Sequence, residues 1–176
     1  MKGLKENFQK AHIVIIGSGI IGKFNALELA ELGFQITIVD PAQPQNCSNA
    51  ALGLLMGNMY QKRRGRSWDL RKQSIELWPQ WIKLLQKFNS ELNIEKPLIQ
   101  LTTNEEKFKK LEKFIYENND QDLRILERDS IFIKNINKAF QATNIKGMIS
   151  FKDGRINPFS LLQTCLLYTS DAADED

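Results

Sequence analysis

The sequence predicts an α/β fold built around a parallel sheet, and three consecutive features near its N-terminus support this prediction. The run "HIVIIG", which begins at His12, is short, apolar and rich in β-branched residues, as in a buried parallel strand. A segment with helical spacing follows, and Gly33 is a natural stop at its C-terminus. "FQITIVD" is the second predicted strand and ends in Asp40. The expected inner face of the helix comprises Ile21, Phe24, Ala26, Leu27, Leu29, Ala30 and Leu32.

The loop between the first strand and the helix has the pattern GxGxxG, and each glycine has a predicted role. Gly17 permits a tight turn, Gly19 lets a pyrophosphate approach the backbone, and Gly22 lets the helix pack closely on the strand. The N-terminus of the helix presents free N–H groups and the positive end of its dipole to phosphates. Strand, glycine loop, helix and strand together predict a Rossmann-like dinucleotide-binding unit.

The acidic residue at the end of the second strand completes this pattern. The Asp40 carboxylate can accept hydrogen bonds from the ribose hydroxyls of an adenosine. Pro41 follows, so no Arg stands there to pair with a 2′-phosphate, and the pattern favours NAD or FAD over NADP. The predicted cofactor contacts of this unit are Gly17, Ser18, Gly19, Ile20, Ile21, Gly22 and Asp40.

A stretch of small apolar residues, "SNAALGLLMGNM", begins at Ser48. A dinucleotide unit followed by such a stretch resembles the FAD-dependent amine and amino-acid oxidoreductases of the D-amino-acid oxidase family. In that family a Ser-x-Ala-Ala-x-Gly segment lies along the ribityl chain and the flavin ring. The resemblance implies FAD contacts at Ser48, Ala50, Ala51 and Gly53, with Leu54, Leu55 and Met56 beside the ring. A buried strand of small residues is the alternative interpretation.

The resemblance also implies a reaction. Members of the family oxidise the C–N bond of a small amino acid or amine by hydride transfer to flavin N5, and the electrons pass to oxygen or to a respiratory acceptor. The family's substrate-binding Arg and Tyr are expected beyond residue 176, so no catalytic residue is assigned. Two alternatives remain at this point: an NAD-binding dehydrogenase or regulatory module, and a non-catalytic nucleotide-binding remnant.

The same resemblance divides the chain into parts. Residues 1–92 are expected to form the first part of a FAD-binding domain, including a long helix from Arg66 to Leu85 that is kinked at Pro79. Residues 93–153 are expected to begin an α+β substrate domain, and 154–164 to return to the FAD-binding domain. Residues 165–176, "CLLYTSDAADED", resemble the translation of a sequencing adapter, so we expect a C-terminally truncated chain.

Several local signals refine this outline. Thr103 and Glu106 have the spacing of a capping box, and the helix that follows should bury the stripe Phe108, Leu111, Phe114 and Ile115. Asp153-Gly154 is a hairpin-like turn signal, whereas Asn157 and Pro158 should open a new helix. In "QKRRGR", a solvated basic loop is the favoured interpretation, and the alternative is that Arg64 or Arg66 faces the flavin or a substrate carboxylate.

Composition narrows the partners and the location. The chain has 176 residues, 42% of them hydrophobic, and no apolar run long enough to span a membrane. Two cysteines, Cys47 and Cys165, are too few for a disulfide framework, and no signal peptide is recognisable, so a cytoplasmic location is expected. One His predicts no metal site, and the net charge of +3 is spread over scattered lysines, so nucleic acid is not expected as a partner.

Overall fold

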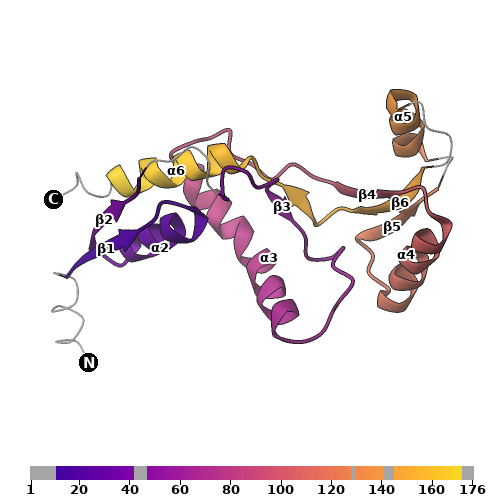
Figure 1. Cartoon of the computed structure of the whole chain (residues 1–176), viewed down its shortest axis with the longest axis horizontal. Coiled ribbons are helices and arrows are strands. Elements are labelled where there is room, and N and C mark those ends of the chain that lie inside the picture. The colour runs from indigo at the N-terminus through magenta and orange to yellow at the C-terminus, as the bar shows by residue number, and fades with distance from the viewer. Residues whose placement is uncertain (1–10, 42–46, 128–129, 141–144, 172–176) are drawn as a thin grey trace. The chain divides into compact units, whose positions relative to one another are not determined.

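The computed structural model describes residues 11–41, 47–127, 130–140 and 145–171 (Figure 1). The chain forms two compact units and passes between them more than once. The first unit comprises Met1–Gly53, Pro79–Asn93 and Ile156–Asp176, and the second comprises Leu54–Trp78 and Ile94–Arg155. Among the described residues, no helix is both long enough and apolar enough to cross a membrane.

The first unit contains the predicted strand–helix–strand arrangement. β1 (His12–Ile16) and β2 (Gln35–Val39) pair in parallel along their whole length, and α2 (Ile20–Glu31) connects them. Two neighbouring parallel strands need a crossover connection of this kind. A tight turn would reverse the chain and make the strands antiparallel. α2 also contacts α6 (Pro158–Asp171). The predicted α/β fold with a parallel sheet is therefore confirmed.

The buried surface of this unit is smaller than the sequence predicts. Ala26 and Leu27 of α2 are completely buried, but Ile21 and Leu32 are 76% and 59% exposed. The predicted inner face was too wide. A neighbouring element covers only one stripe along a helix, and Ile21 and Leu32 lie outside that stripe. The strands are likewise covered on one face only, the face that packs on α2, and the residues of that face are half-buried. On the other face, Val14, Ile16 and Val39 are more than half exposed.

The second unit is an antiparallel sheet with a helix on each face. β6 (Lys146–Ser150) lies between β4 (Leu98–Thr102) and β5 (Leu123–Leu126), and it is antiparallel to both. Successive residues of β6 point to opposite faces. One face packs with α4 (Glu105–Asn118) around Met59, Leu111, Phe114, Leu123 and Met148. The other packs with α5 (Ile131–Phe140) around Leu126, Ile133, Ile145 and Ile149 (Figure 1).

A second, smaller ladder lies beside this sheet within the same unit. β3 (Leu54–Leu55) pairs antiparallel with β7 (Gly154–Arg155), and Arg155 also exchanges two backbone hydrogen bonds with Glu95. The predicted Asp153-Gly154 hairpin is therefore wrong: β6 and β7 do not pair with each other, because each has partners elsewhere in the unit. The sequence analysis also did not predict α5.

The long helix and the helix starts were predicted with mixed success. α3 (Arg66–Leu85) has the expected bounds and contains Pro79, where the chain passes from the second unit to the first. Asn157 caps α6 as predicted, since its Oδ1 accepts a hydrogen bond from the Phe159 amide at 3.0 Å. The Thr103–Glu106 capping box is wrong, because Asn104 caps α4 by accepting from the Lys107 amide at 2.9 Å.

The compact units and the predicted domains differ in one segment. Residues 54–78, which the sequence analysis placed in the FAD-binding domain, group with the second unit. α6 continues through the described part of the segment predicted to be foreign. Cys165 is completely buried there, and Tyr168 packs edge-to-face on Phe88 with ring centroids 4.9 Å apart. The domain bounds and the adapter origin of 165–176 stay predictions.

Candidate cofactor-binding site

The glycine loop of the first unit has the geometry that its predicted roles require. Gly17 has φ +101°, in the left-handed region that glycine tolerates best, and its amide donates to the Val39 carbonyl at 2.8 Å. A Cβ added at Gly22 would lie 2.0 Å from the Gly17 carbonyl oxygen. Only glycine at 22 therefore lets the first turn of α2 approach the loop this closely.

The N-terminus of α2 has the chemistry of an anion-binding site. Gly19 is the N-cap and has no side chain to occupy the first-turn amides, and the first turn contains no acidic residue. The amides of this turn have no acceptor within the helix and carry the positive end of the helix dipole. One of them, from Ile20, donates to Ser48 Oγ at 2.9 Å. A Cβ at Gly19 would lie 3.1 Å from the same hydroxyl.

Two predicted contacts from distant parts of the sequence thus meet the glycine loop. Besides Ser48, the half-buried Asp40 follows β2 and accepts a hydrogen bond from the Ser18 amide, with 2.6 Å between Oδ2 and N. The site combines a helix N-terminus, a hydroxyl and a carboxylate at the end of the second strand. This donor and acceptor set fits the pyrophosphate and the adenosine ribose of a dinucleotide.

A buried lysine stands just inside this site. Lys23 is 5% exposed and donates from Nζ to the Leu162 carbonyl at 3.0 Å. Burial lowers the pKa of Lys23, and the nearby Cys165 and Asp40 act in the opposite direction. Burial also raises the pKa of the Cys165 thiol to about 11. Lys23 links α2 to α6 and adds a cationic group near Asp40, a role that the sequence did not reveal.

The remaining predicted contacts are more dispersed. Ala50 and Ala51 are exposed, at the end of a turn that begins at Cys47 and directly after it. Gly53 has φ +70°, its carbonyl accepts from the Ile156 amide at 2.9 Å, and a Cβ there would lie 1.9 Å from the Ile156 oxygen. Leu54 begins β3 in the second unit and is 43% exposed. The structure therefore brings Ser48 and Asp40 to the glycine loop, while the others extend away from Ser48 along the chain.

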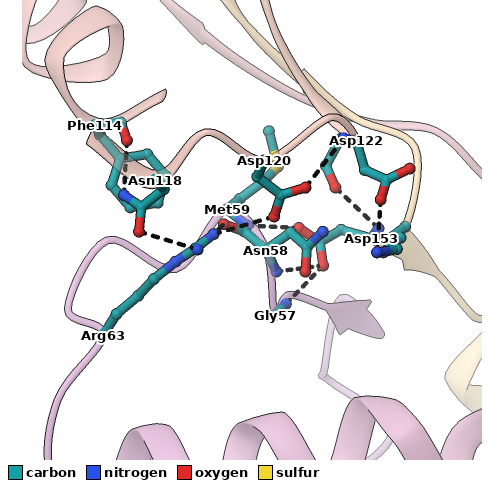
Figure 2. A network of polar contacts seen from close by, with 11 residues as sticks. Gly57, Asn58, Met59, Arg63, Phe114, Asn118, Asp120, Asp122 and Asp153 are labelled. Carbon is teal, nitrogen blue, oxygen red and sulfur yellow. Dashed lines mark hydrogen bonds and ion pairs between the residues drawn. The ribbon is translucent and has the colours of Figure 1, made fainter. Parts of the chain in front are cut away.

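The basic loop of the second unit is exposed at two of its arginines, as expected of a solvated loop, but a third arginine is held by other residues. Arg64 and Arg66 are exposed, whereas Arg63 is held in a polar network (Figure 2). Its Nη2 donates to the Asn58 carbonyl at 2.6 Å and lies 3.6 Å from Asp120, and its Nη1 donates to Asn118 at 3.1 Å. Lys62, Arg63 and Arg64 are adjacent and all basic, so the sequence does not distinguish them. Arg63 differs because it has partners on α4 and in the turn that follows α4.

Comparisons with known proteins identify the family of the chain. The family described as FAD dependent oxidoreductase (DAO) matches residues 12–171. A curated relative, the uncharacterized oxidoreductase YurR of Bacillus subtilis (strain 168), is 30% identical over 74 residues, which are 42% of this chain and 20% of that protein.

Solved structures share the fold. Glycine oxidase from Bacillus cereus ATCC 14579 aligns with a TM-score of 0.71 and 23% identity, over 93% of this chain and 44% of that one. Iminodiacetate oxidase from Chelativorans sp. BNC1 aligns with a TM-score of 0.75 and 18% identity, over 92% and 45%. L-amino acid deaminase from Proteus myxofaciens has a TM-score of 0.70 and 17% identity, over 93% and 37%. This chain spans less than half the length of each of these three proteins. On the family match and the geometry of its glycine loop, the chain belongs to the FAD-dependent oxidoreductase family, whose cofactor is FAD.

Proposed function

We propose that this protein oxidises the C–N bond of a small amino acid or amine. The observation that carries the proposal is the junction of the α2 N-terminus, Ser48 and Asp40 in a chain of a FAD-dependent family. When bound, FAD would supply the two-electron acceptor, with flavin N5 as the site that takes the hydride from the substrate α-carbon, and water would hydrolyse the imine so formed. Oxygen or a respiratory acceptor then takes the electrons, and the protein acts in the cytoplasm.

The residues of the first unit hold the two polar ends of the nucleotide in this proposal. The first-turn amides of α2 bind the pyrophosphate, and Asp40 accepts hydrogen bonds from the adenosine ribose. Ser48 can do two things at once, because a hydroxyl has one proton to donate and two lone pairs. It keeps the hydrogen bond from Ile20 and donates its own proton to a phosphate oxygen.

The stretch after Ser48 is assigned to the flavin. Ala50 and Ala51 are exposed, and together with the half-buried Gly53 they carry little side chain, which suits a flat ring that needs N–H donors at its edge and no bulk against its face. Leu54 adds an exposed apolar side chain directly after Gly53. These residues position and shield the ring, and no residue of this chain is assigned to proton transfer.

The substrate class rests on the names of the structural neighbours. Glycine oxidase, iminodiacetate oxidase and L-amino acid deaminase all act on amino acids or close derivatives by name.

The test is anaerobic reduction of the FAD-loaded protein. Glycine, sarcosine, and D- and L-amino acids are added in turn, and the visible flavin absorbance is followed. We expect at least one to bleach the flavin, with ammonia or an amine released by hydrolysis of the imine. If dithionite bleaches the flavin but no amine or amino acid does, the proposed reaction is contradicted. Formation of NADH from added NAD would instead favour the dehydrogenase alternative.

A further inference from the structure

The second unit contains a buried carboxylate that has no part in the predicted nucleotide site. Asp153 is completely buried and accepts hydrogen bonds from three successive backbone amides (Figure 2). Its Oδ1 lies 2.7 Å from the Gly57 nitrogen and 2.9 Å from that of Asn58, and its Oδ2 lies 2.7 Å from that of Met59. No ion pair of Asp153 is found among the described residues. A buried carboxylate is costly unless hydrogen bonds replace its hydration, and three converging amides provide that replacement.

Asp153 is itself fixed by the sheet of its own unit. Its amide donates to the hydroxyl of Ser150, which is completely buried at the end of the central strand β6. The next two residues, Gly154 and Arg155, form β7 and pair with Leu55 and Leu54. The three residues from Asp153 to Arg155 therefore hold two nearby parts of one earlier segment: Gly154 and Arg155 pair with 54–55, and Asp153 binds the amides of 57–59.

The backbone of that earlier segment, Leu54–Met59, is held at nearly every residue. β7 pairs with its first two residues, and Arg71 donates to the Met56 carbonyl at 2.9 Å. Asp153 binds the next three amides, and Arg63 binds the Asn58 carbonyl. Yet the side chain of Leu54 remains 43% exposed. A fixed backbone that presents an apolar side chain outward is what a rigid ligand contact requires.

We propose that Asp153 is a positioning residue for the flavin-side segment, defined here as Leu54–Met59. Asp153 fixes the turn at 57–59, the turn fixes β3, and β3 presents Leu54 to the ring. This inference rests on the proposed function, because that function assigns Leu54 to the flavin. It goes further by naming a residue that touches neither cofactor nor substrate and that acts through the backbone of three others.

Substitutions of graded severity separate this role from a general loss of stability. In Asp153→Asn, the remaining oxygen can still accept from two amides, but the new NH₂ group faces the third, so one buried donor is left unpaired. Ser150→Ala leaves the carboxylate intact and removes only the acceptor of its own amide. Asp122→Asn is the matched control, since it removes a carboxylate of the same unit that pairs with Lys152 at the surface.

The first measurement is amide hydrogen exchange in the second unit. We expect Asp153→Asn to speed exchange at Gly57, Asn58 and Met59 on the order of tenfold, the size expected from one unpaired buried donor, with α4 unchanged. Ser150→Ala should produce a smaller change at the same amides, and Asp122→Asn none. Equal exchange at 57–59 in the unchanged protein and in Asp153→Asn would overturn the proposed clamp.

The second measurement is the visible absorption spectrum of the bound flavin at saturating FAD. A merely structural residue would change the amount of folded protein but not this spectrum. We expect Asp153→Asn to shift or broaden the flavin bands while Asp122→Asn leaves them superimposable on the original. Identical spectra for Asp153→Asn would overturn the positioning role. If the unchanged protein binds no FAD, the proposed function fails and the link to flavin fails with it, whereas the exchange data still decide whether Asp153 fixes the turn.

Discussion

The Ser48 hydroxyl accepts a hydrogen bond from the Ile20 amide across 28 residues of sequence, with 2.9 Å between Oγ and N. This contact ties the start of the small-residue stretch to the helix N-terminus that would bind the pyrophosphate. Two predicted contacts that are separate in sequence thus form one site.

Ser48→Ala should weaken both the helix start and the binding of FAD. The substitution removes the acceptor of the Ile20 amide, and loss of such a cap typically costs about 1 kcal/mol. We expect a lower unfolding midpoint in denaturant and a higher FAD dissociation constant. Ser48→Thr keeps the hydroxyl and serves as the control. Equal FAD affinity in all three proteins would show that Ser48 does not border the cofactor.

Asp40→Ala should weaken FAD binding by about 1–3 kcal/mol, the usual cost of losing a hydrogen bond to a charged group. The reason is twofold: the ribose loses its acceptor, and the Ser18 amide loses the carboxylate that now fixes the loop. Asp40→Asn retains one oxygen and should show a smaller loss. Fluorescence titration with FAD measures both, and an unchanged affinity in Asp40→Ala would place the ribose elsewhere.

Gly53→Ala should destabilise the fold more than Gly65→Ala does. Both glycines have positive φ, +70° and +78°, so both alanines bear a conformational cost of about 1–2 kcal/mol. Only at Gly53 would the new Cβ also collide with a carbonyl oxygen, that of Ile156, whereas nothing lies within 4 Å at Gly65. Denaturant unfolding of the two variants compares the costs. Equal losses would mean that the Gly53–Ile156 contact is looser than described.

Cys165 should make stability fall as the pH rises through the alkaline range. Its pKa increases from 9.0 to about 11 in the folded protein, so the unfolded thiol ionises first and draws the equilibrium toward unfolding. The loss should begin near pH 9, approach completion near pH 11, and amount to roughly 1–3 kcal/mol.

The difference in unfolding free energy between the unchanged protein and Cys165→Ala reports this effect together with the influence of the thiol on Lys23, whose lowered pKa acts oppositely in the same range. A thiol reagent at neutral pH should label the exposed Cys47 and spare Cys165 until the protein unfolds. Rapid labelling of both thiols would contradict the packing of α6 at Cys165.

The local motif was predictable because its parts are contiguous. Gly17 and Gly22 are constrained by neighbours within a few residues, and Asp40 stands at a fixed spacing after a strand that periodicity reveals. The family resemblance assigned the Ser48 segment to the flavin, and the structure brings Ser48 itself to the glycine loop. Both inferences rest on short stretches whose chemistry tolerates few alternatives.

Long-range partners decided the parts that the sequence missed. Asp153 followed by Gly154 resembles a turn, and only the arrival of three amides from residues 57–59 makes the carboxylate a buried acceptor. At the start of α4, Thr103 and Asn104 are both good caps one residue apart, so the local signal could not choose between them. The choice of Arg63 over Arg64 in the basic loop depended in the same way on α4 and the turn that follows it.

The most direct test of the central claim is a titration of the purified protein with FAD and, separately, with NAD, alongside the Gly19→Val variant. We predict a saturable flavin complex, no comparable NAD complex, and loss of FAD binding in Gly19→Val. The branched side chain would displace Ser48 and fill the path of the pyrophosphate, while circular dichroism should remain that of the folded protein. Retention of FAD by Gly19→Val, or binding of NAD in preference to FAD, would contradict the assignment of the α2 N-terminus as the flavin nucleotide site.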